Sequence, residues 1–254
     1  MLALMASRNA GEVISLVQDN KVLPSLATLI VYYLTAPQWP TVSWAPFGLC
    51  GPQISTSSMS PKRTVGFLGF GRISQATLAR LIPFGITDCL YTSNPNSTPT
   101  PSRDEDFAKR HGLSSLRRVD VNDLARKSDI LFVLAPGGPL TRHLVNEEFL
   151  KKMKKTSVLV NTSRGTLVDS DALAKALREK WIWGAGLDVV EGEPNVTAEH
   201  PLVKEPRCIV LPHVGSGTFE TRLGMATLAV QNLLAGIDGG DSHMPAALDL
   251  TNKL

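Results

Sequence analysis

The sequence predicts an α/β fold built on a doubly wound parallel sheet. Short apolar runs rich in β-branched residues recur from residue 64 onward, and segments with helical periodicity separate several of them. Strands that are apolar along nearly their whole length suit a parallel sheet, because helices cover both of its faces. A glycine-rich turn, residues 69–74, joins the first run to a helical pattern, which is the strand–turn–helix order that such a sheet needs.

The elements are predicted in chain order as follows. An amphipathic helix is expected over residues 1–21, where apolar positions recur at helical spacing. A final helix is expected from about Thr218 to Leu234, with a loop and an extended tail after it. Between these helices lie the predicted strands, which are residues 64–68, 88–92, 129–135, 157–161, 184–189 and 208–212.

The composition is that of a folded globular protein. Of the 254 residues, 43% are hydrophobic, which is enough for a core. Lysine plus arginine exceeds aspartate plus glutamate by only three (26 against 23), and the charges are scattered, so no nucleic-acid partner is expected. The most apolar stretch, residues 22–36, is shorter than the roughly 20 residues that span a bilayer. It also contains Pro24, so no membrane segment is expected.

The cysteines indicate a reducing compartment. Cys50, Cys89 and Cys208 are odd in number, far apart and not spaced as metal ligands. Buried thiols are therefore expected, rather than a disulfide or a metal site. A cytoplasmic location follows from this interpretation.

The glycine-rich turn has the residue types of a phosphate-binding turn. Gly69, Gly71 and Ser74 fill a G-x-G-x-x-G frame in which Ser replaces the third glycine. Gly69 allows a tight turn, and Gly71 lets a pyrophosphate approach the backbone. Arg72 and Ile73 open the helix, whose N-terminus supplies free N–H groups and a positive dipole end. A plain strand-to-helix turn is the alternative, but the strand before it and the helix after it favour a bound dinucleotide.

The end of the second predicted strand bears on which dinucleotide is bound. An Asp or Glu there would hold the ribose 2′-OH of NAD, but this stretch has Ser93 and Asn94 and no carboxylate. A 2′-phosphate would meet no negative charge, and these side chains can hydrogen-bond it. NADP is therefore the expected cofactor, with NAD as the second choice. The alternative interpretation is that these are turn residues only.

Polar residues that could take part in catalysis or binding follow the later predicted strands, at the edge where open α/β sheets bind ligands. They are Arg164, Asp188, Glu191, Glu193 and His213. These stretches, together with the glycine turn and a Pro-Phe-Gly tripeptide, resemble the D-isomer-specific 2-hydroxyacid dehydrogenases. Within that family the pattern is most similar to the glyoxylate/hydroxypyruvate reductases.

The resemblance implies a Rossmann-type NAD(P)-binding domain and the reduction of glyoxylate or hydroxypyruvate to a D-2-hydroxy acid. The chemistry of the residues agrees with it. The planar guanidinium of Arg164 can hold a substrate carboxylate and polarise the adjacent carbonyl. His213 can give the proton that the resulting alkoxide needs. Matching to the family pattern puts the carboxylate that supports this imidazole on Glu193 rather than Glu191.

The resemblance also implies further cofactor contacts. Asp188 matches the family position near the nicotinamide end of the cofactor. Pro136, Thr162 and Gly215 match lesser contacts. The other histidines, His143 among them, lack such company and are expected at the surface.

The chain departs from the family pattern in two places. Family members have a substrate domain that mostly precedes the cofactor domain, whereas this chain starts at the helix that enters the cofactor domain. We expect residues 1–218 to form the dinucleotide-binding domain and residues 219–254 to be a remnant of the substrate domain, with impaired activity as the consequence. Residues 22–38 interrupt the pattern and are expected to be an insertion, either a retained intron or a lid or oligomer contact.

Two functions stay open at this point. The first is an NADPH-dependent reductase that acts on a small 2-oxo acid and forms a homodimer through its cofactor domain. The alternative is a catalytically inactive module that binds the cofactor or pairs with a partner chain. An assay of NADPH oxidation with glyoxylate separates the two.

Overall fold

In the computed structural model, the chain forms two compact units, Met1–Pro212 and His213–Leu254. The segment 22–38 and Cys50, on which two of the predictions fall, lie outside the described residues. The described residues are 1–11, 51–56, 62–98, 100–238 and 245–246.

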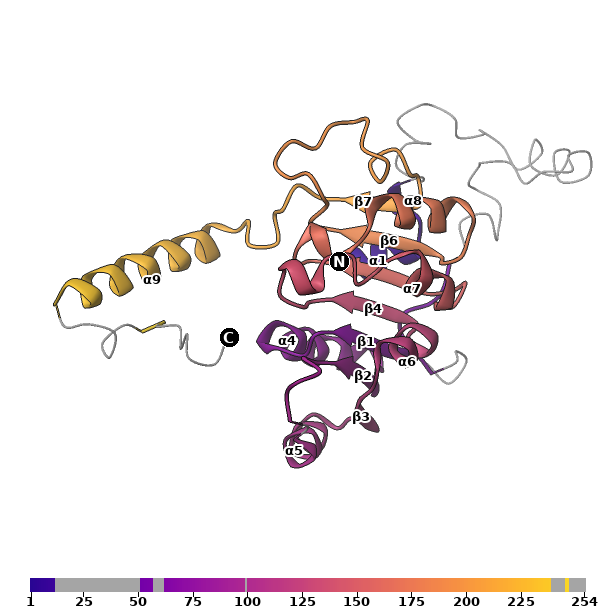
Figure 1. The fold of residues 1–254 in the computed structure, drawn as a ribbon. Helices are drawn as coiled ribbons and strands as arrows, with labels where there is room; N and C mark the ends of the chain where they lie inside the picture. Colours follow the sequence, from indigo (N-terminus) through magenta and orange to yellow (C-terminus); the bar gives the residue numbers. More distant parts are fainter. Residues whose placement is uncertain (12–50, 57–61, 99, 239–244, 247–254) are drawn as a thin grey trace, which may run out of the picture. The chain divides into compact units, whose positions relative to one another are not determined.

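The first unit is built on a seven-stranded sheet in the order β3-β2-β1-β4-β5-β6-β7, and every pairing is parallel (Figure 1). Within the sheet, the first strand, β1, lies in the middle. The next strands are added on one side out to β3, and the chain then returns to β4 and adds strands on the other side out to β7. The predicted doubly wound parallel sheet is confirmed. The strands are β1 Thr64–Leu68, β2 Asp88–Thr92, β3 Ser115–Arg118, β4 Ile130–Val133, β5 Val158–Asn161, β6 Gly184–Leu187 and β7 Cys208–Val210.

The predicted strands differ from the observed ones at their ends and in one omission. β1 and β2 match the predicted ranges, whereas β4, β6 and β7 stop two residues earlier than predicted because the chain turns into loops there. The edge strand β3 was missed, since its sequence SLRR has a single apolar residue and no hydrophobic run. This strand is defined by its backbone pairing with β2 and not by buried side chains.

Helices cover both faces of the sheet. Side chains that alternate along each strand belong to two separate hydrophobic clusters, so the clusters lie on opposite faces. One cluster receives fully buried leucines from α6, α7 and α8, and the other receives apolar side chains from α1, α4 and α5. The helices of this unit are α1 Leu2–Ser7, α4 Arg72–Leu81, α5 Pro101–His111, α6 Val121–Lys127, α7 Glu147–Lys152 and α8 Ser170–Arg178, with 3-10 turns at Ile82–Phe84, Pro139–Thr141 and Gly165–Leu167.

The first helix packs against β6 through glycine. A Cβ at Gly186 would stand 2.9 Å from the Cβ of Leu2, so only a residue without a side chain lets α1 approach this closely. The indole of Trp183 donates to the carbonyl of Ser7 at 3.0 Å. The single amphipathic helix predicted for residues 1–21 is wrong at its first turns: α1 ends at Ser7, and Asn9 has a φ of 48°, which breaks the helix.

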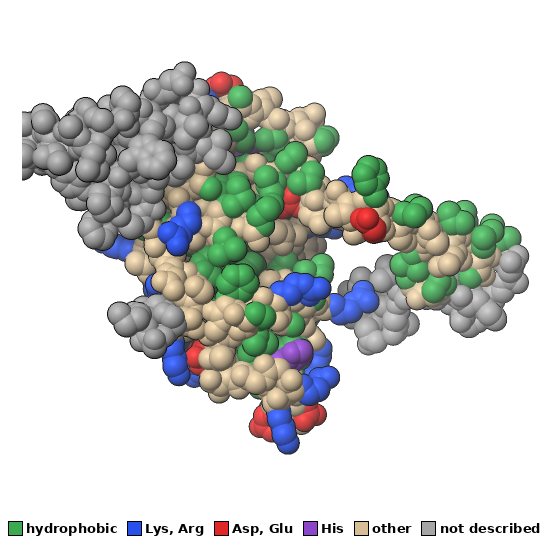
Figure 2. Space-filling view, turned by 180° about the vertical axis from the view of Figure 1, so that it is seen from behind, with side chains coloured by type: hydrophobic (Ala, Val, Ile, Leu, Met, Phe, Trp, Pro, Cys, Tyr) green, Lys and Arg blue, Asp and Glu red, His purple; other side chains and the backbone are tan. Residues whose placement is uncertain are grey.

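The second unit contains α9, Phe219–Asp238, which continues four residues past the predicted end. Thr218 precedes it, and its hydroxyl accepts the N–H of Thr221 at 3.2 Å, which satisfies one free donor of the first turn. Apolar side chains, Leu223, Leu228 and Leu233 among them, are exposed along this helix (Figure 2).

The remaining fold-level predictions concern cysteines and membranes. Cys89 and Cys208 are free thiols buried in the first unit, as predicted, and burial raises the pKa of both. In the described part of the chain, no helix combines the length and the apolar character that crossing a membrane requires.

Candidate cofactor and substrate site

The predicted site residues of the first unit gather at one edge of the sheet. All strands are parallel, so their carboxyl ends share this edge. Each predicted residue stands at or just beyond such an end. Gly69, Gly71, Arg72 and Ile73 follow β1, Ser93 and Asn94 follow β2, Pro136 follows β4, Thr162 and Arg164 follow β5, and Asp188 and Glu193 follow β6.

The glycine turn leaves open space where a diphosphate would lie. Gly69 has a φ of +95°, and a Cβ there would stand 2.8 Å from the Cα of Ala135, so the position requires glycine. Gly71 is the N-cap of α4, and a Cβ there would meet nothing within 4 Å. No side chain caps this helix end, so its first N–H groups face an open cradle. These features fit a nicotinamide dinucleotide bound by its pyrophosphate.

Ser74, at the third position of the glycine frame, is accommodated by a hydrogen bond. Its hydroxyl donates to the carbonyl of Gly69 at 2.7 Å, and the residue is 1% exposed. The small side chain therefore packs between α4 and the turn and also holds the turn from inside. This contact explains how the frame tolerates a serine where glycine is usual.

Aromatic side chains of the core pack against Phe70 of the turn. Phe70 stacks on Tyr91 with ring centroids 4.5 Å apart, and it also contacts Phe67 and Phe107. The Tyr91 hydroxyl donates to Asp104 of α5 at 2.5 Å. Burial, followed by this hydrogen bond, raises the pKa of Tyr91, so the phenol stays neutral. Phe70 is thus fixed between the two glycines that bracket it.

The loop after β2 is held by its own side chains and by β3. The Ser93 and Ser97 hydroxyls are 3.2 Å apart, and the Asn94 side chain accepts the N–H of Asn96 at 2.9 Å. From the end of β3, Arg118 donates to the carbonyls of Asn94 and Ser97, each at 2.8 Å. Sequence reasoning missed Arg118, because 24 residues separate it from Asn94 and the strand that carries it was not predicted.

Arg164 stands on a loop that Asn161 shapes. The Asn161 amide, fully buried, donates to the carbonyl of Arg164 at 2.9 Å and accepts the N–H of Ser163 at 3.1 Å. The guanidinium lies at the surface, where it donates to the Ser163 carbonyl at 2.7 Å. A side chain at Gly137 would stand 2.8 Å from the Arg164 Cγ, so that glycine makes room for the arginine. Asn161 is a second residue that sequence reasoning missed.

The loops after β5 and β6 are in direct contact. A Cβ at Gly165 would overlap the backbone of Val190, which places the Arg164 loop against the turn that carries Glu193. The N–H of Asp188 donates to the Asn161 carbonyl at 2.9 Å, and Asp188 is buried at 4% exposure. The Glu193 carboxylate accepts the N–H of Val190 at 2.7 Å. Arg164, Asp188 and Glu193 therefore belong to two loops that are in contact.

Glu191 is engaged elsewhere. Its carboxylate pairs with Nε2 of His143 at 2.8 Å and with Arg142 at 3.0 Å, and Nδ1 of the same imidazole lies 3.8 Å from Asp169. These contacts tie the loop after β4 to the turn after β6. The side chain of His143 is 30% exposed, but the expectation that it lacks charged neighbours is wrong, because Glu191 and Asp169 flank its ring. The pairing of Glu191 is consistent with giving the catalytic role to Glu193.

The last two predicted residues, His213 and Gly215, belong to the second unit. His213 has a φ of 55°, a left-handed conformation that is uncommon for a residue with a side chain. Whether its imidazole meets Glu193 stays a prediction. In the residues that the structure describes, no group of three His, Cys, Asp or Glu side chains could hold a metal ion.

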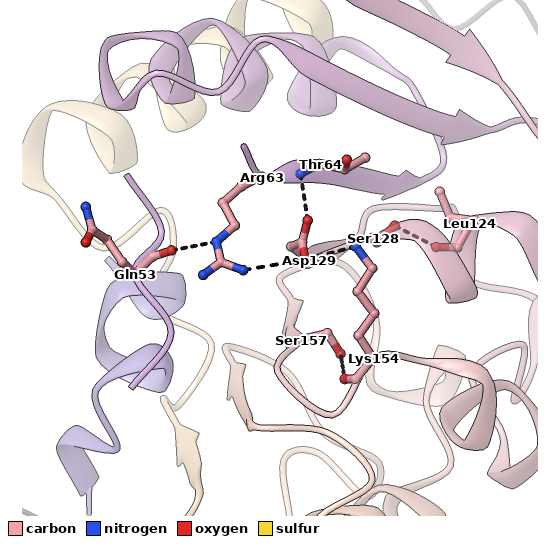
Figure 3. Close-up of polar contacts among 8 residues, drawn as sticks. All are labelled: Gln53, Arg63, Thr64, Leu124, Ser128, Asp129, Lys154 and Ser157. Atoms are coloured by element: carbon pink, nitrogen blue, oxygen red, sulfur yellow. Dashed lines mark hydrogen bonds and ion pairs between the residues drawn. The ribbon is translucent and has the colours of Figure 1, made fainter. Parts of the chain in front are cut away.

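A different polar cluster lies at the opposite, amino edge of the sheet (Figure 3). Asp129, just before β4, accepts the N–H of Thr64 at 2.8 Å and the ammonium of Lys154 at 2.9 Å. The Arg63 guanidinium lies 3.7 Å from the same carboxylate and donates to the Gln53 carbonyl at 2.9 Å. This cluster joins β1, β4 and the segment 51–56.

Comparison with known proteins agrees with the fold of the first unit. Residues 47–215 match the sequence model of the D-isomer specific 2-hydroxyacid dehydrogenase NAD binding domain. A human glyoxylate reductase/hydroxypyruvate reductase is 41% identical over 208 residues, covering 82% of this chain and 58% of that protein. A glyoxylate reductase of Thermofilum pendens is 40% identical over 209 residues, covering 81% of this chain and 55% of that protein.

Solved structures give the same result. A glyoxylate reductase from Paecilomyes thermophila superimposes with a TM-score of 0.71 at 28% identity, covering 94% of this chain and 60% of that one. The D-mandelate dehydrogenase of Rhodotorula graminis gives 0.72 at 26% identity, covering 96% and 62%. The chain spans a little over half the length of the curated relatives it matches. By its sequence match and its fold, the chain belongs to the D-isomer specific 2-hydroxyacid dehydrogenase family.

Proposed function

We propose that this chain is the cofactor-binding part of an NADPH-dependent reductase that converts glyoxylate or hydroxypyruvate to the D-2-hydroxy acid. The observation that carries the proposal is the open cradle at Gly71, with Arg164 and Glu193 on neighbouring loops of the same edge. The names of the relatives supply the substrate class. Arg72, Ile73, Ser93, Asn94, Pro136, Thr162, Asp188 and Gly215 are proposed to complete the cofactor contacts.

The proposed mechanism assigns one task to each polar residue. When bound, the reduced nicotinamide supplies a hydride. Arg164 holds the substrate carboxylate with two parallel hydrogen bonds and polarises the neighbouring carbonyl. His213 donates a proton to the carbonyl oxygen as negative charge develops there. Glu193 accepts a hydrogen bond from the imidazole, which fixes its orientation and favours its charged form.

NADPH is preferred in this proposal because the loop after β2 offers hydroxyl and amide groups and no carboxylate. Ser93 and Asn94 follow the strand directly, where an acidic residue would hold the 2′-OH of NADH. Replacing Ser93 with Asp should therefore shift the preference toward NADH. A cytoplasmic homodimer joined through the cofactor domain completes the proposal, and the buried free thiols of Cys89 and Cys208 suit that compartment.

A second candidate function is a cofactor-binding module without turnover. Substrate must be held in near-attack geometry in a water-poor cleft, which is worth several kcal/mol of the barrier. If Arg164 alone holds the substrate, turnover should be slower by orders of magnitude than in a full-length reductase, while NADPH still binds.

The test is NADPH oxidation with glyoxylate, compared between the wild type and His213→Ala. We expect the variant to lose about 100- to 10,000-fold in kcat, because general acid catalysis is worth that much. NADPH affinity, measured by fluorescence titration, should stay unchanged. His111→Ala, at the end of helix α5 and outside the proposed set of catalytic residues, is the matched control and should keep the wild-type rate.

The outcomes separate the two functions. Turnover that depends on His213 supports the reductase. NADPH binding with no turnover supports the module. A His213→Ala variant that retains half of the wild-type kcat would remove His213 from the mechanism.

A further inference from the structure

Arg118 brings a positive charge to the loop that follows β2. Its two terminal nitrogens, Nη1 and Nη2, donate to the carbonyls of Ser97 and Asn94, each at 2.8 Å. The loop itself, residues 93–98, has no arginine or lysine. The neighbouring strand thus supplies the cation that the loop lacks.

The placement follows from the sheet. β3 pairs with β2 in parallel, and Arg118 stands opposite Tyr91, two residues before Ser93. Both strands end at the edge that carries the glycine turn. Arg118 is half-buried, so its stem is fixed against the sheet while the guanidinium reaches the loop.

The two hydrogen bonds leave the charge of Arg118 available. They use two of the five guanidinium N–H groups and end on carbonyl oxygens, which carry no net charge. The Ser97 hydroxyl donates to the Asn94 carbonyl at 2.7 Å, and the Ser93 hydroxyl lies 3.2 Å from it in the same loop. Ser93 can therefore turn its proton toward an anion, whereas Ser97 helps to hold the loop. A guanidinium beside a hydroxyl is a donor set that suits a phosphate.

We propose that Arg118 recognises the 2′-phosphate of NADPH, together with Ser93. This inference rests on the proposed function, in which a nicotinamide dinucleotide binds at the turn around Gly71. It adds the residue that determines the choice between NADPH and NADH. The guanidinium both orders the loop through its carbonyls and pairs with the dianionic phosphate that distinguishes the two cofactors.

The experiment measures binding without turnover. Dissociation constants for NADPH and NADH are determined by titration calorimetry for the wild type, Arg118→Gln and Arg117→Gln. Arg117 is the matched control, because it lies one residue earlier in β3 and is exposed, so its loss removes the same charge from the other face. Adenosine 2′,5′-bisphosphate and ADP serve as probes that isolate the adenosine end of the site.

We expect Arg118→Gln to weaken NADPH and adenosine 2′,5′-bisphosphate by about 10- to 100-fold, the usual loss for one charge-assisted hydrogen-bonding partner. NADH and ADP should weaken by less than about twofold, since they carry no 2′-phosphate. Arg118→Lys, which keeps the charge but not the fork, should recover part of the NADPH affinity. Arg117→Gln should leave all four ligands unchanged.

The opposing outcomes are distinct. Equal weakening of NADPH and NADH in Arg118→Gln, with no recovery in Arg118→Lys, would mean that Arg118 only orders the loop, and the inference would be wrong. Wild-type protein that binds NADH as tightly as NADPH would also overturn it while leaving cofactor binding intact. Wild-type protein that binds neither dinucleotide would instead overturn the proposed function. Melting curves of each variant confirm that the protein tested is folded.

Discussion

The two edges of the sheet use charged and polar residues in opposite ways. At the amino edge, the Asp129 carboxylate is enclosed, with a side chain 10% exposed, and the Thr64 N–H, Lys154 and Arg63 satisfy it. At the carboxyl edge, no side chain caps the helix whose N-cap is Gly71, and the space beside that glycine is open. The first edge is complete without a ligand, and the second has donors directed at a space.

Three other helices that follow strands sharpen this contrast, whereas α5, which begins with Pro101, also has no side-chain cap. α6, α7 and α8 begin with Asp120, Asn146 and Asp169, whose side chains accept N–H groups of their own first turns. α4 begins with glycine and leaves those donors unoccupied by any side chain. Self-capped helix ends are stable by themselves, whereas an open end next to a glycine turn is adapted to an external anion.

The largest effect is expected from closing the open helix end. Gly71 has extended backbone angles like those of Asp120, so Gly71→Asp can cap α4 as Asp120 caps α6. Stability should hold or rise by a few tenths of a kcal/mol, because Asp caps slightly better than Gly. NADPH affinity should fall by at least about 100-fold, since a carboxylate then fills the cradle and repels the diphosphate. Calorimetric titration and thermal melting measure both.

Gly71→Asn is the control for this prediction. It has nearly the same size and caps equally well but carries no charge, so the difference between the two variants reports electrostatic repulsion. Wild-type NADPH affinity in Gly71→Asp would show that the cradle is not the phosphate site, and the contrast between the two edges would then have another cause.

The next effect comes from breaking the enclosed cluster. Asp129→Ala leaves the Thr64 N–H without its acceptor and two cations without their shared carboxylate. We expect a loss of about 2–3 kcal/mol in the free energy of unfolding, typical of an uncompensated buried polar group. NADPH affinity of the folded fraction should not change. Urea denaturation measures the loss.

Two variants calibrate the Asp129 result. Asp129→Asn keeps an acceptor for the Thr64 N–H and should cost less than the alanine variant. Asp123→Ala removes an exposed pair with Lys127 and should cost no more than about 0.5 kcal/mol. A weakened NADPH affinity in Asp129→Ala would show that the two edges are coupled through the sheet.

The same contrast explains how much could be predicted from the sequence. The glycine turn, β1 and β2 depend on residues that are adjacent in the chain, and their ranges follow directly from the pattern. The polar residues after β5 and β6 were placed at the correct edge because parallel strands share it.

The contacts that were missed either join distant parts of the chain or end on backbone carbonyls. The Asp129 carboxylate meets the Thr64 N–H across 65 residues, and Glu191 meets His143 across 48. Arg118 and Asn161 act through backbone carbonyls, which no side-chain pattern records. Such contacts depend on the register of neighbouring strands and on loop geometry, so periodicity and short motifs do not predict them.

The smallest effect tests an enclosed polar pair at the carboxyl edge itself. Tyr91→Phe keeps the ring that stacks on Phe70 but removes the hydroxyl that donates to Asp104. We expect a loss of about 1 kcal/mol in the free energy of unfolding at pH 8, as for one buried hydrogen bond. NADPH affinity should change by less than about twofold, because the stack still supports the turn.

The pH dependence of this variant has a definite sign. Burial raises the pKa of Tyr91 above its ordinary value of 10.0, so the unfolded chain loses this proton before the folded protein does. The stabilisation from Tyr91 is therefore fully present below about pH 10 and declines as the pH rises further, because deprotonation then favours the unfolded state. The stability gap between wild type and Tyr91→Phe should accordingly shrink between about pH 8 and about pH 10.5 in paired urea titrations. A gap that stays constant or widens over this range would show that Tyr91 is not held neutral beneath the turn, and that this edge lacks the enclosed pair that the amino edge has in Asp129.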